Sequence, residues 1–162
     1  MGSGKSTVGA ELARRWGVVF VDLDLRVARI SGLTVAALFA RSEVEFREHE
    51  AGALRSLVAE PGFEGGGAVV ATGGGVVLDA SNRALMSRLG RTCYLDADVE
   101  TLVARLSHPA ELARRPLLAG GDLRGELVRI KERREQYYRG ADIIVDAASP
   151  VPEVVEKIVD AL

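Results

Sequence analysis

Short apolar runs alternate with longer segments of helical periodicity along the chain, and this alternation is what most constrains the fold. The apolar runs are continuous, as in strands that are buried on both faces of a sheet. Strands that alternate with helices in this way are typical of βαβ units around a parallel sheet, so we predict an α/β fold. The predicted strands are Val18–Val21, Ala68–Thr72, Thr92–Leu95 and Ile143–Val145.

Between the predicted strands, apolar residues recur three and four positions apart, which predicts amphipathic helices. Residues Leu33–Glu60 fit two helices that bend near Arg41 and Ser42. The stretch Ser107–Asp122 is marked by prolines and glycines around adjacent arginines, and we expect it to form a flap. The other predicted helices are Ser6–Trp16, Val99–Leu106, Leu123–Arg139 and a last one at about Glu153–Leu162.

The composition fits one globular domain over residues 1–162 and excludes several classes of partner. Of the 162 residues, 48% are hydrophobic, and 21 basic against 23 acidic side chains leave a net charge of −2. A near-neutral chain has no overall field that attracts nucleic acid or a membrane surface, so we expect neither partner. Cys93 is the only cysteine, which suits a reducing compartment, and we expect a cytoplasmic monomer.

A glycine-rich segment directly precedes the first predicted helix. Backbone N–H groups at a helix start can surround phosphate oxygens, and glycines let the backbone approach them. Lys5 adds a charge that reaches the β- and γ-phosphates, and the Ser6 hydroxyl is suited to ligate Mg²⁺. The alternative is a glycine-rich helix cap that binds no ligand, with an incidental lysine. The segment consists of Gly2, Ser3, Gly4, Lys5, Ser6 and Thr7.

The complete form of this P-loop has an earlier glycine and follows a buried strand, and neither precedes Gly2 in this sequence. We therefore expect a gap at the centre of the sheet, with lost ladder hydrogen bonds on both sides. We interpret Met1 as a start assigned roughly ten residues late. On this hypothesis, the chain is less stable and binds nucleotide more weakly than a version extended upstream by a strand.

Two carboxylates follow the first predicted strand, where ligands bind in open α/β sheets. Asp22 and Asp24 are two positions apart, so on an extended chain both side chains point to the same side. One is suited to hold hydrated Mg²⁺ and the other to accept a proton from an attacking hydroxyl. Helix capping is the alternative for Asp24. Gly73–Gly75 directly follow another strand, which indicates either backbone approach to a ligand or a plain turn.

Taken together, these motifs resemble shikimate kinases over essentially the whole chain. The motifs are, in order, Gly2–Thr7, Asp22-x-Asp24, Phe46-Arg47, Gly73–Gly75 and Arg115-Pro116-Leu117-Leu118. The resemblance implies a three-layer α/β/α P-loop kinase fold whose first central strand is truncated, with a lid at about 107–122 and acceptor-binding helices at about 33–60. It also implies phosphorylation of the 3-hydroxyl of shikimate, in aromatic amino acid biosynthesis, with ATP and Mg²⁺.

The resemblance also implies roles for individual residues. The segment from Gly2 to Thr7 would hold the ATP phosphates, with Ser6 and Asp22 at the metal. Asp24 would orient or deprotonate the acceptor hydroxyl, and Lys5 and Arg115 would contact the phosphate in transfer.

The shikimate carboxylate would be held by two arginines, which match Arg47, next to Phe46, and Arg133. A slip of one residue would exchange Arg133 for Arg134. Gly73, Gly74 and Gly75 would meet the ring hydroxyls. Arg105 matches an arginine that stacks on adenine, or is an exposed helix residue.

Two further interpretations stay open. A related small-molecule kinase, for gluconate or a nucleoside, would share the P-loop and a lid arginine, although Gly73–Gly75 and Phe46-Arg47 argue against it. A truncated, non-catalytic kinase-like module is supported only by the lack of the first strand, and the intact Lys5 and Asp24 oppose it.

Overall fold

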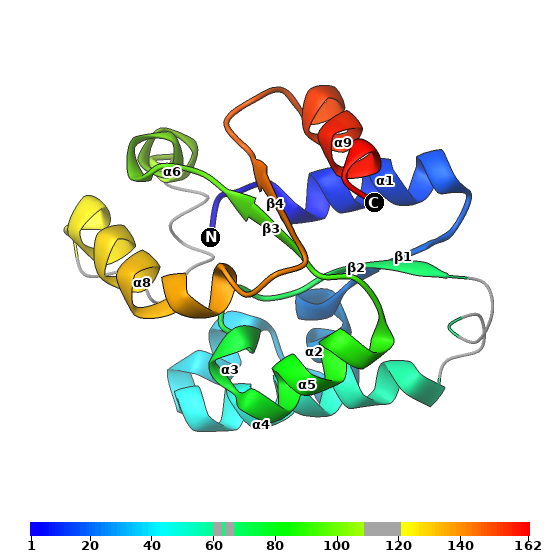
Figure 1. Ribbon diagram of the computed structural model, residues 1–162. Coiled ribbons are helices and arrows are strands. Elements are labelled where there is room, and N and C mark those ends of the chain that lie inside the picture. Colours follow the sequence, from blue (N-terminus) through cyan, green and yellow to red (C-terminus); the bar gives the residue numbers. More distant parts are fainter. Residues whose placement is uncertain (60–62, 64–66, 109–120) are drawn as a thin grey trace.

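The computed structural model describes residues 1–59, 63, 67–108 and 121–162, and its elements form three layers (Figure 1). The strands lie in the middle, with α1 and α9 over one face and α2 to α5 over the other. In chain order the elements are α1 Lys5–Trp16, β1 Val19–Asp22, α2 Leu23–Ser31, α3 Val35–Arg41, α4 Glu43–Ser56, the 3-10 helix Leu57–Ala59, β2 Ala68–Ala71, the 3-10 helix Val76–Leu78, α5 Ala80–Leu89, β3 Cys93–Asp96, α6 Val99–Leu106, α8 Leu123–Tyr138, β4 Ile143–Asp146 and α9 Val151–Asp160.

The strands form two parallel pairs. β1 pairs with β2 and β3 pairs with β4, whereas no ladder joins β2 to β3 in the described part of the chain. A cavity of about 320 Å³ lies between the pairs, lined by Ala68 and Val70 on one side and by Tyr94 and Leu95 on the other. The expected gap in the sheet is therefore present, and each predicted strand agrees with the observed one to within one residue at either end.

Two apolar clusters fill the spaces between the layers. One joins α1, α6, α8 and α9 to β3 and β4, with Leu12, Leu95 and Val154 among its buried members. The other packs α2 to α5 beneath β1 and β2, around Leu23 and Leu54. Burial of this kind contributes roughly 1.5–3 kcal/mol for each large aliphatic side chain, which holds the helices against the strands.

Most predicted helices agree with the structure, and the bend in the segment after residue 33 is confirmed. Ser42 ends α3 and caps α4, because its backbone N–H donates to Leu38 while its side chain accepts from Val44 N. Helices α2 and α5 were not predicted. Most of the expected flap lies outside the described residues.

The prediction that Asp22 and Asp24 share one face of an extended strand is wrong. Asp22 ends β1 and caps α2, so the chain turns into a helix at Leu23, and Asp24 lies in the first helical turn. The side chain that caps α2 is thus that of Asp22. The alternative interpretation, in which Asp24 caps the helix, is also wrong.

Candidate active site

The glycine-rich segment forms a tight loop at the start of α1. Gly2 and Gly4 have φ values of +75° and +86°, which favour glycine, and Gly4 is the N-cap without any side-chain cap. A Cβ on Gly2 would also lie 2.9 Å from Leu106 of α6, so a side chain at this position would collide. The N–H groups of the first turn have no intrahelical acceptors, and together with the helix dipole they favour an anion here.

Ser6 and Asp22 connect this loop to the end of β1. The Ser6 hydroxyl donates to Asp22 Oδ2 at 2.6 Å, while Oδ1 accepts from the N–H groups of Asp24 and Leu25 at 3.0 and 3.2 Å. Asp22 therefore fixes both the Ser6 side chain and the helix that carries Asp24. The pair presents a hydroxyl and a carboxylate, which are hard oxygen donors of the kind that Mg²⁺ prefers.

Three glycines follow β2 across from the phosphate loop, and acidic side chains reach the first of them. A Cβ on Gly73 would lie 3.1 Å from Asp24 Oδ1 and in closer contact with Glu50 Oε1. Only a glycine leaves room for both carboxylates at this point.

Two arginines approach the other glycines of this turn. The Arg47 guanidinium packs against Gly75 so closely that a Cβ there would overlap it, and Arg134 Nη1 would lie 3.6 Å from a Cβ on Gly74. Nε of each arginine is buried and has no hydrogen-bond partner among the described residues. Unsatisfied buried donors are rare in proteins, so this pair is suited to an anionic ligand.

Arg134, rather than Arg133, thus lies at the site. Arg134 is 5% exposed, whereas Arg133 is exposed on the solvent side of α8. Adjacent residues on a helix point about 100° apart, so only one of them can face the turn.

Glu50 is a site residue that the sequence analysis missed. It is 1% exposed, and its Oε2 accepts from Arg47 Nη1 at 2.7 Å. Burial raises the pKa of the Glu50 carboxyl, and the nearby Arg47 opposes that shift only in part. The spacing of three between Arg47 and Glu50 on one helix was the available signal, since such residues are neighbours on the helix surface.

Phe46 belongs to the core behind the site instead of its surface. Its side chain is 3% exposed and stacks on Phe39, with ring centroids 4.4 Å apart. The Arg47 guanidinium carbon lies 5.0 Å from the Phe46 ring centre and 5.5 Å from that of Phe39. The two rings therefore form a platform that holds Arg47 at its glycine.

The phosphate loop and the glycine turn line one cavity of about 310 Å³. Arg105 of α6 lines it as well, and its Nη2 donates to the carbonyl oxygens of Ala147 and Ala148 at 2.8 and 3.3 Å. Ser3 is buried, and Arg115 lies outside the described residues. The predicted members of the lining are Gly2, Gly4, Lys5, Ser6, Thr7, Asp22, Asp24, Gly73 and Gly74.

Comparison with known proteins gives the family of this chain. The family model for shikimate kinase matches residues 1–162. The chain belongs to the shikimate kinase family. Membership of the shikimate kinase family makes the chain an enzyme with ATP as a substrate, and it confirms the predicted P-loop kinase fold.

Individual shikimate kinases are similar over nearly all of the chain. That of Gloeobacter violaceus is 44% identical over 163 residues, which cover 100% of this chain and 88% of the relative. That of Chromobacterium violaceum is 39% identical and covers 100% of this chain and 85% of the relative.

Solved structures agree with this assignment. The shikimate kinase of Acinetobacter baumannii, solved in complex with shikimate, has a TM-score of 0.88 at 30% identity and covers 99% of this chain and 87% of its own. The enzyme of Aquifex aeolicus has a TM-score of 0.80 at 33% identity, with 99% and 90% covered. Among the described residues, no helix is both long and apolar enough to span a membrane.

Proposed function

We propose that this chain transfers the γ-phosphoryl group of ATP to the 3-hydroxyl of shikimate, which forms shikimate 3-phosphate for aromatic amino acid biosynthesis. The observation that carries the proposal is the convergence of Asp24, Arg47 and Arg134, from three helices, on the glycine turn Gly73–Gly75. A carboxylate beside two arginines suits an acceptor that has both hydroxyls and an acid group. Family membership and the shikimate-bound structure of a relative support the same substrate.

The donor side of the proposal rests on the loop before α1. The backbone from Gly2 to Thr7 holds the phosphates, and Lys5 offsets charge on the β- and γ-phosphates. Arg105 lines the same cavity, tied to the chain after β4, and we assign it to the adenine end. Arg115 is proposed as the lid arginine that contacts the phosphate in transfer.

Mg²⁺ fits the residues present at this loop. The Ser6 hydroxyl and the Asp22 carboxylate are oxygen donors joined to each other, and Mg²⁺ in phosphoryl-transfer sites takes only one or two protein ligands beside phosphates and water. The ion would supply charge neutralisation of the phosphates.

On the acceptor side, Arg47 and Arg134 hold the carboxylate of the ring, and Gly73, Gly74 and Gly75 let the ring approach the backbone. Asp24 aims the reacting hydroxyl at the phosphate and accepts its proton. Because phosphoryl transfer passes through a loose transition state, catalysis consists mainly of such positioning and of charge stabilisation.

The proposal includes a setting for the enzyme. We infer one kinase domain over residues 1–162, acting as a cytoplasmic monomer without nucleic-acid or membrane partners. The net charge of −2 and the single cysteine support this setting.

A panel of acceptors tests the function. Purified protein with ATP and Mg²⁺ is assayed for ADP release in the presence of shikimate, quinate, gluconate or nucleosides. We expect turnover with shikimate to exceed all others. Faster turnover of gluconate or a nucleoside would contradict the assignment, and binding of ATP without turnover of any acceptor would favour the non-catalytic module.

A further inference from the structure

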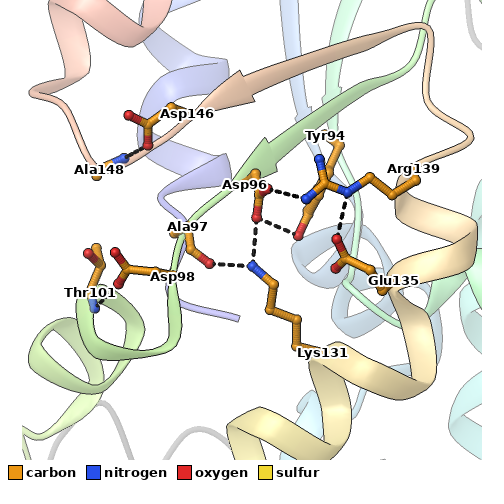
Figure 2. A network of polar contacts seen from close by, with 10 residues as sticks. All are labelled: Tyr94, Asp96, Ala97, Asp98, Thr101, Lys131, Glu135, Arg139, Asp146 and Ala148. Carbon is orange, nitrogen blue, oxygen red and sulfur yellow. Dashed lines mark hydrogen bonds and ion pairs between the residues drawn. The ribbon is translucent and has the colours of Figure 1, made fainter.

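A carboxylate outside the active site joins β3 to the helix that carries Arg134. Asp96, the last residue of β3, accepts from three side chains (Figure 2). Its Oδ1 accepts from Lys131 Nζ at 2.7 Å and from the Tyr94 hydroxyl at 2.9 Å, and its Oδ2 accepts from Arg139 Nη2 at 2.9 Å. Lys131 also donates to the carbonyl oxygen of Ala97 at 2.9 Å, and Arg139 to Glu135 at 2.6 Å.

The two cationic partners of Asp96 lie at either end of one helical segment. Arg139, the C-cap of α8, follows Lys131 by eight positions, which corresponds to roughly 12 Å along the helix. Arg134 and Tyr138 lie between these two points. One carboxylate therefore fixes both the position and the rotation of the part of α8 that faces the glycine turn.

A second route connects the same carboxylate to the turn through aromatic rings. The Tyr94 ring stacks on Tyr138 with centroids 4.8 Å apart and planes 20° apart. The Tyr138 hydroxyl donates to the carbonyl oxygen of Gly74 at 2.6 Å. Tyr94 thus connects the two groups, because its hydroxyl donates to Asp96 and its ring stacks on Tyr138.

The cluster is shielded enough for these contacts to matter. The side chains of Asp96 and Lys131 are only 22% and 25% exposed, whereas Arg139 is 51% exposed. Burial by itself raises the pKa of Asp96, but the hydrogen bonds from Lys131 and Tyr94 outweigh it and hold that pKa below its ordinary value. The carboxylate is ionised at neutral pH, and Lys131 is its less exposed cationic partner.

We propose that Asp96 and Lys131 are positioning residues for the acceptor, which act by holding α8 so that Arg134 and Tyr138 meet the glycine turn. The inference rests on the proposed function, because it concerns the affinity for the acid group of the substrate. Neither residue lines the cavity at the phosphate loop and the glycine turn. Their loss should therefore raise the KM for shikimate while kcat and the KM for ATP stay nearly constant.

Variants Lys131→Met and Asp96→Asn test the proposal, since each keeps the size of the side chain and removes its charge. Asp142→Asn is the matched control. The Asp142 carboxylate accepts from Thr92 N and Thr92 Oγ1, both at 2.7 Å, and so ties the start of β4 to the start of β3 at the end opposite Asp96, by hydrogen bonds that involve no residue of α8. All three variants lose hydrogen bonds to a carboxylate, but only two of them free α8.

We expect Lys131→Met and Asp96→Asn to raise the KM for shikimate roughly tenfold, and Asp142→Asn to lower thermal stability with a KM change below about twofold. Lys131→Arg, which retains the charge, should recover most of the affinity. The proposal would be refuted if Lys131→Met and Asp96→Asn had the same KM for shikimate as wild type. It would also be refuted if the KM rose equally in all three variants.

Hydrogen exchange of the ligand-free proteins separates this proposal from the proposed function. Amides of residues 131–138 should exchange faster in Lys131→Met than in wild type or Asp142→Asn. If wild type fails to phosphorylate shikimate, the proposed function fails. The exchange data still decide whether Asp96 and Lys131 hold α8. Unchanged exchange over residues 131–138 would refute the role of Asp96 and Lys131 in holding α8, even if the enzyme phosphorylates shikimate.

Discussion

Replacing Arg134 with alanine should weaken shikimate binding strongly, while the same change at its neighbour Arg133 should have almost no effect. Arg134 is 5% exposed and has an unsatisfied Nε, whereas Arg133 points to solvent. A hydrogen bond to a charged group contributes about 1.5–3 kcal/mol, and a two-pronged contact with a carboxylate belongs at the upper end. About 3 kcal/mol corresponds to a loss of affinity of roughly 150-fold.

The fold should survive this change. Truncation of Arg134 leaves a small cavity, which destabilises, but it also removes a buried charge whose Nε lacks a partner, and the two effects oppose each other. We therefore expect the free energy of unfolding to change by no more than about 1 kcal/mol, or a Tm shift of about 2–4 °C. For Arg133→Ala, a surface change of about 0.5 kcal/mol allows at most a twofold change in KM.

The assay is ADP release at saturating ATP with shikimate titrated, together with thermal unfolding of each variant. The reasoning is refuted if Arg133→Ala raises the KM for shikimate more than Arg134→Ala does. An unfolded Arg134→Ala protein would also count against it, because that result would make Arg134 a structural residue.

Three further predictions follow from the site. Lys5→Ala and Asp24→Asn should abolish ADP release while circular dichroism stays unchanged, and loss of the folded signal would show that these residues support the core. Gly75→Ala should raise the KM for shikimate by displacing the Arg47 guanidinium, with little change in the KM for ATP, and an unaltered shikimate KM would contradict the contact. Burial raises the pKa of Glu50 above 4.5, so its folded carboxyl keeps a proton that the unfolded chain releases, and this group's contribution to stability is lost as pH rises from about 4.5 through the raised value. In urea unfolding, wild type should therefore lose stability relative to Glu50→Gln as pH rises from about 4.5, and a difference independent of pH would refute the sign.

The elements that the sequence predicted well have a continuous local signal. The four strands are marked by short continuous apolar runs and the helix Val99–Leu106 by its amphipathic stripe, and both signals are local in the sequence. Helix α2 was missed because Asp22, at its N-cap, and Asp24, in its first turn, form a pattern that also suits an extended chain. Its actual signal is the cap, with Asp22 accepting from Asp24 N and Leu25 N.

The candidate site was predictable where a motif fixes the backbone and not where packing decides. The loop Gly2–Thr7 and the turn Gly73–Gly75 are recognisable in the sequence itself. Such glycine patterns mark positions where the backbone needs glycine. The choice between Arg133 and Arg134 depends on the rotation of α8, which Asp96 and the sheet determine from far away in sequence. Glu50 was missed because burial of a charged residue beside Arg47 is a tertiary property.

The division of the strands into two pairs affects how a polypeptide of residues 1–162 behaves at high concentration. The facing sides of β2 and β3 each present backbone N–H and C=O groups that no described strand pairs with, along a cavity lined partly by apolar side chains. Such rows are templates for any extended segment of another molecule, and natural proteins usually cover them or protect them with charge. A polypeptide of residues 1–162 alone should therefore self-associate by strand addition as its concentration rises, and slow growth of β-rich oligomers would reveal this even where the helical layers remain folded.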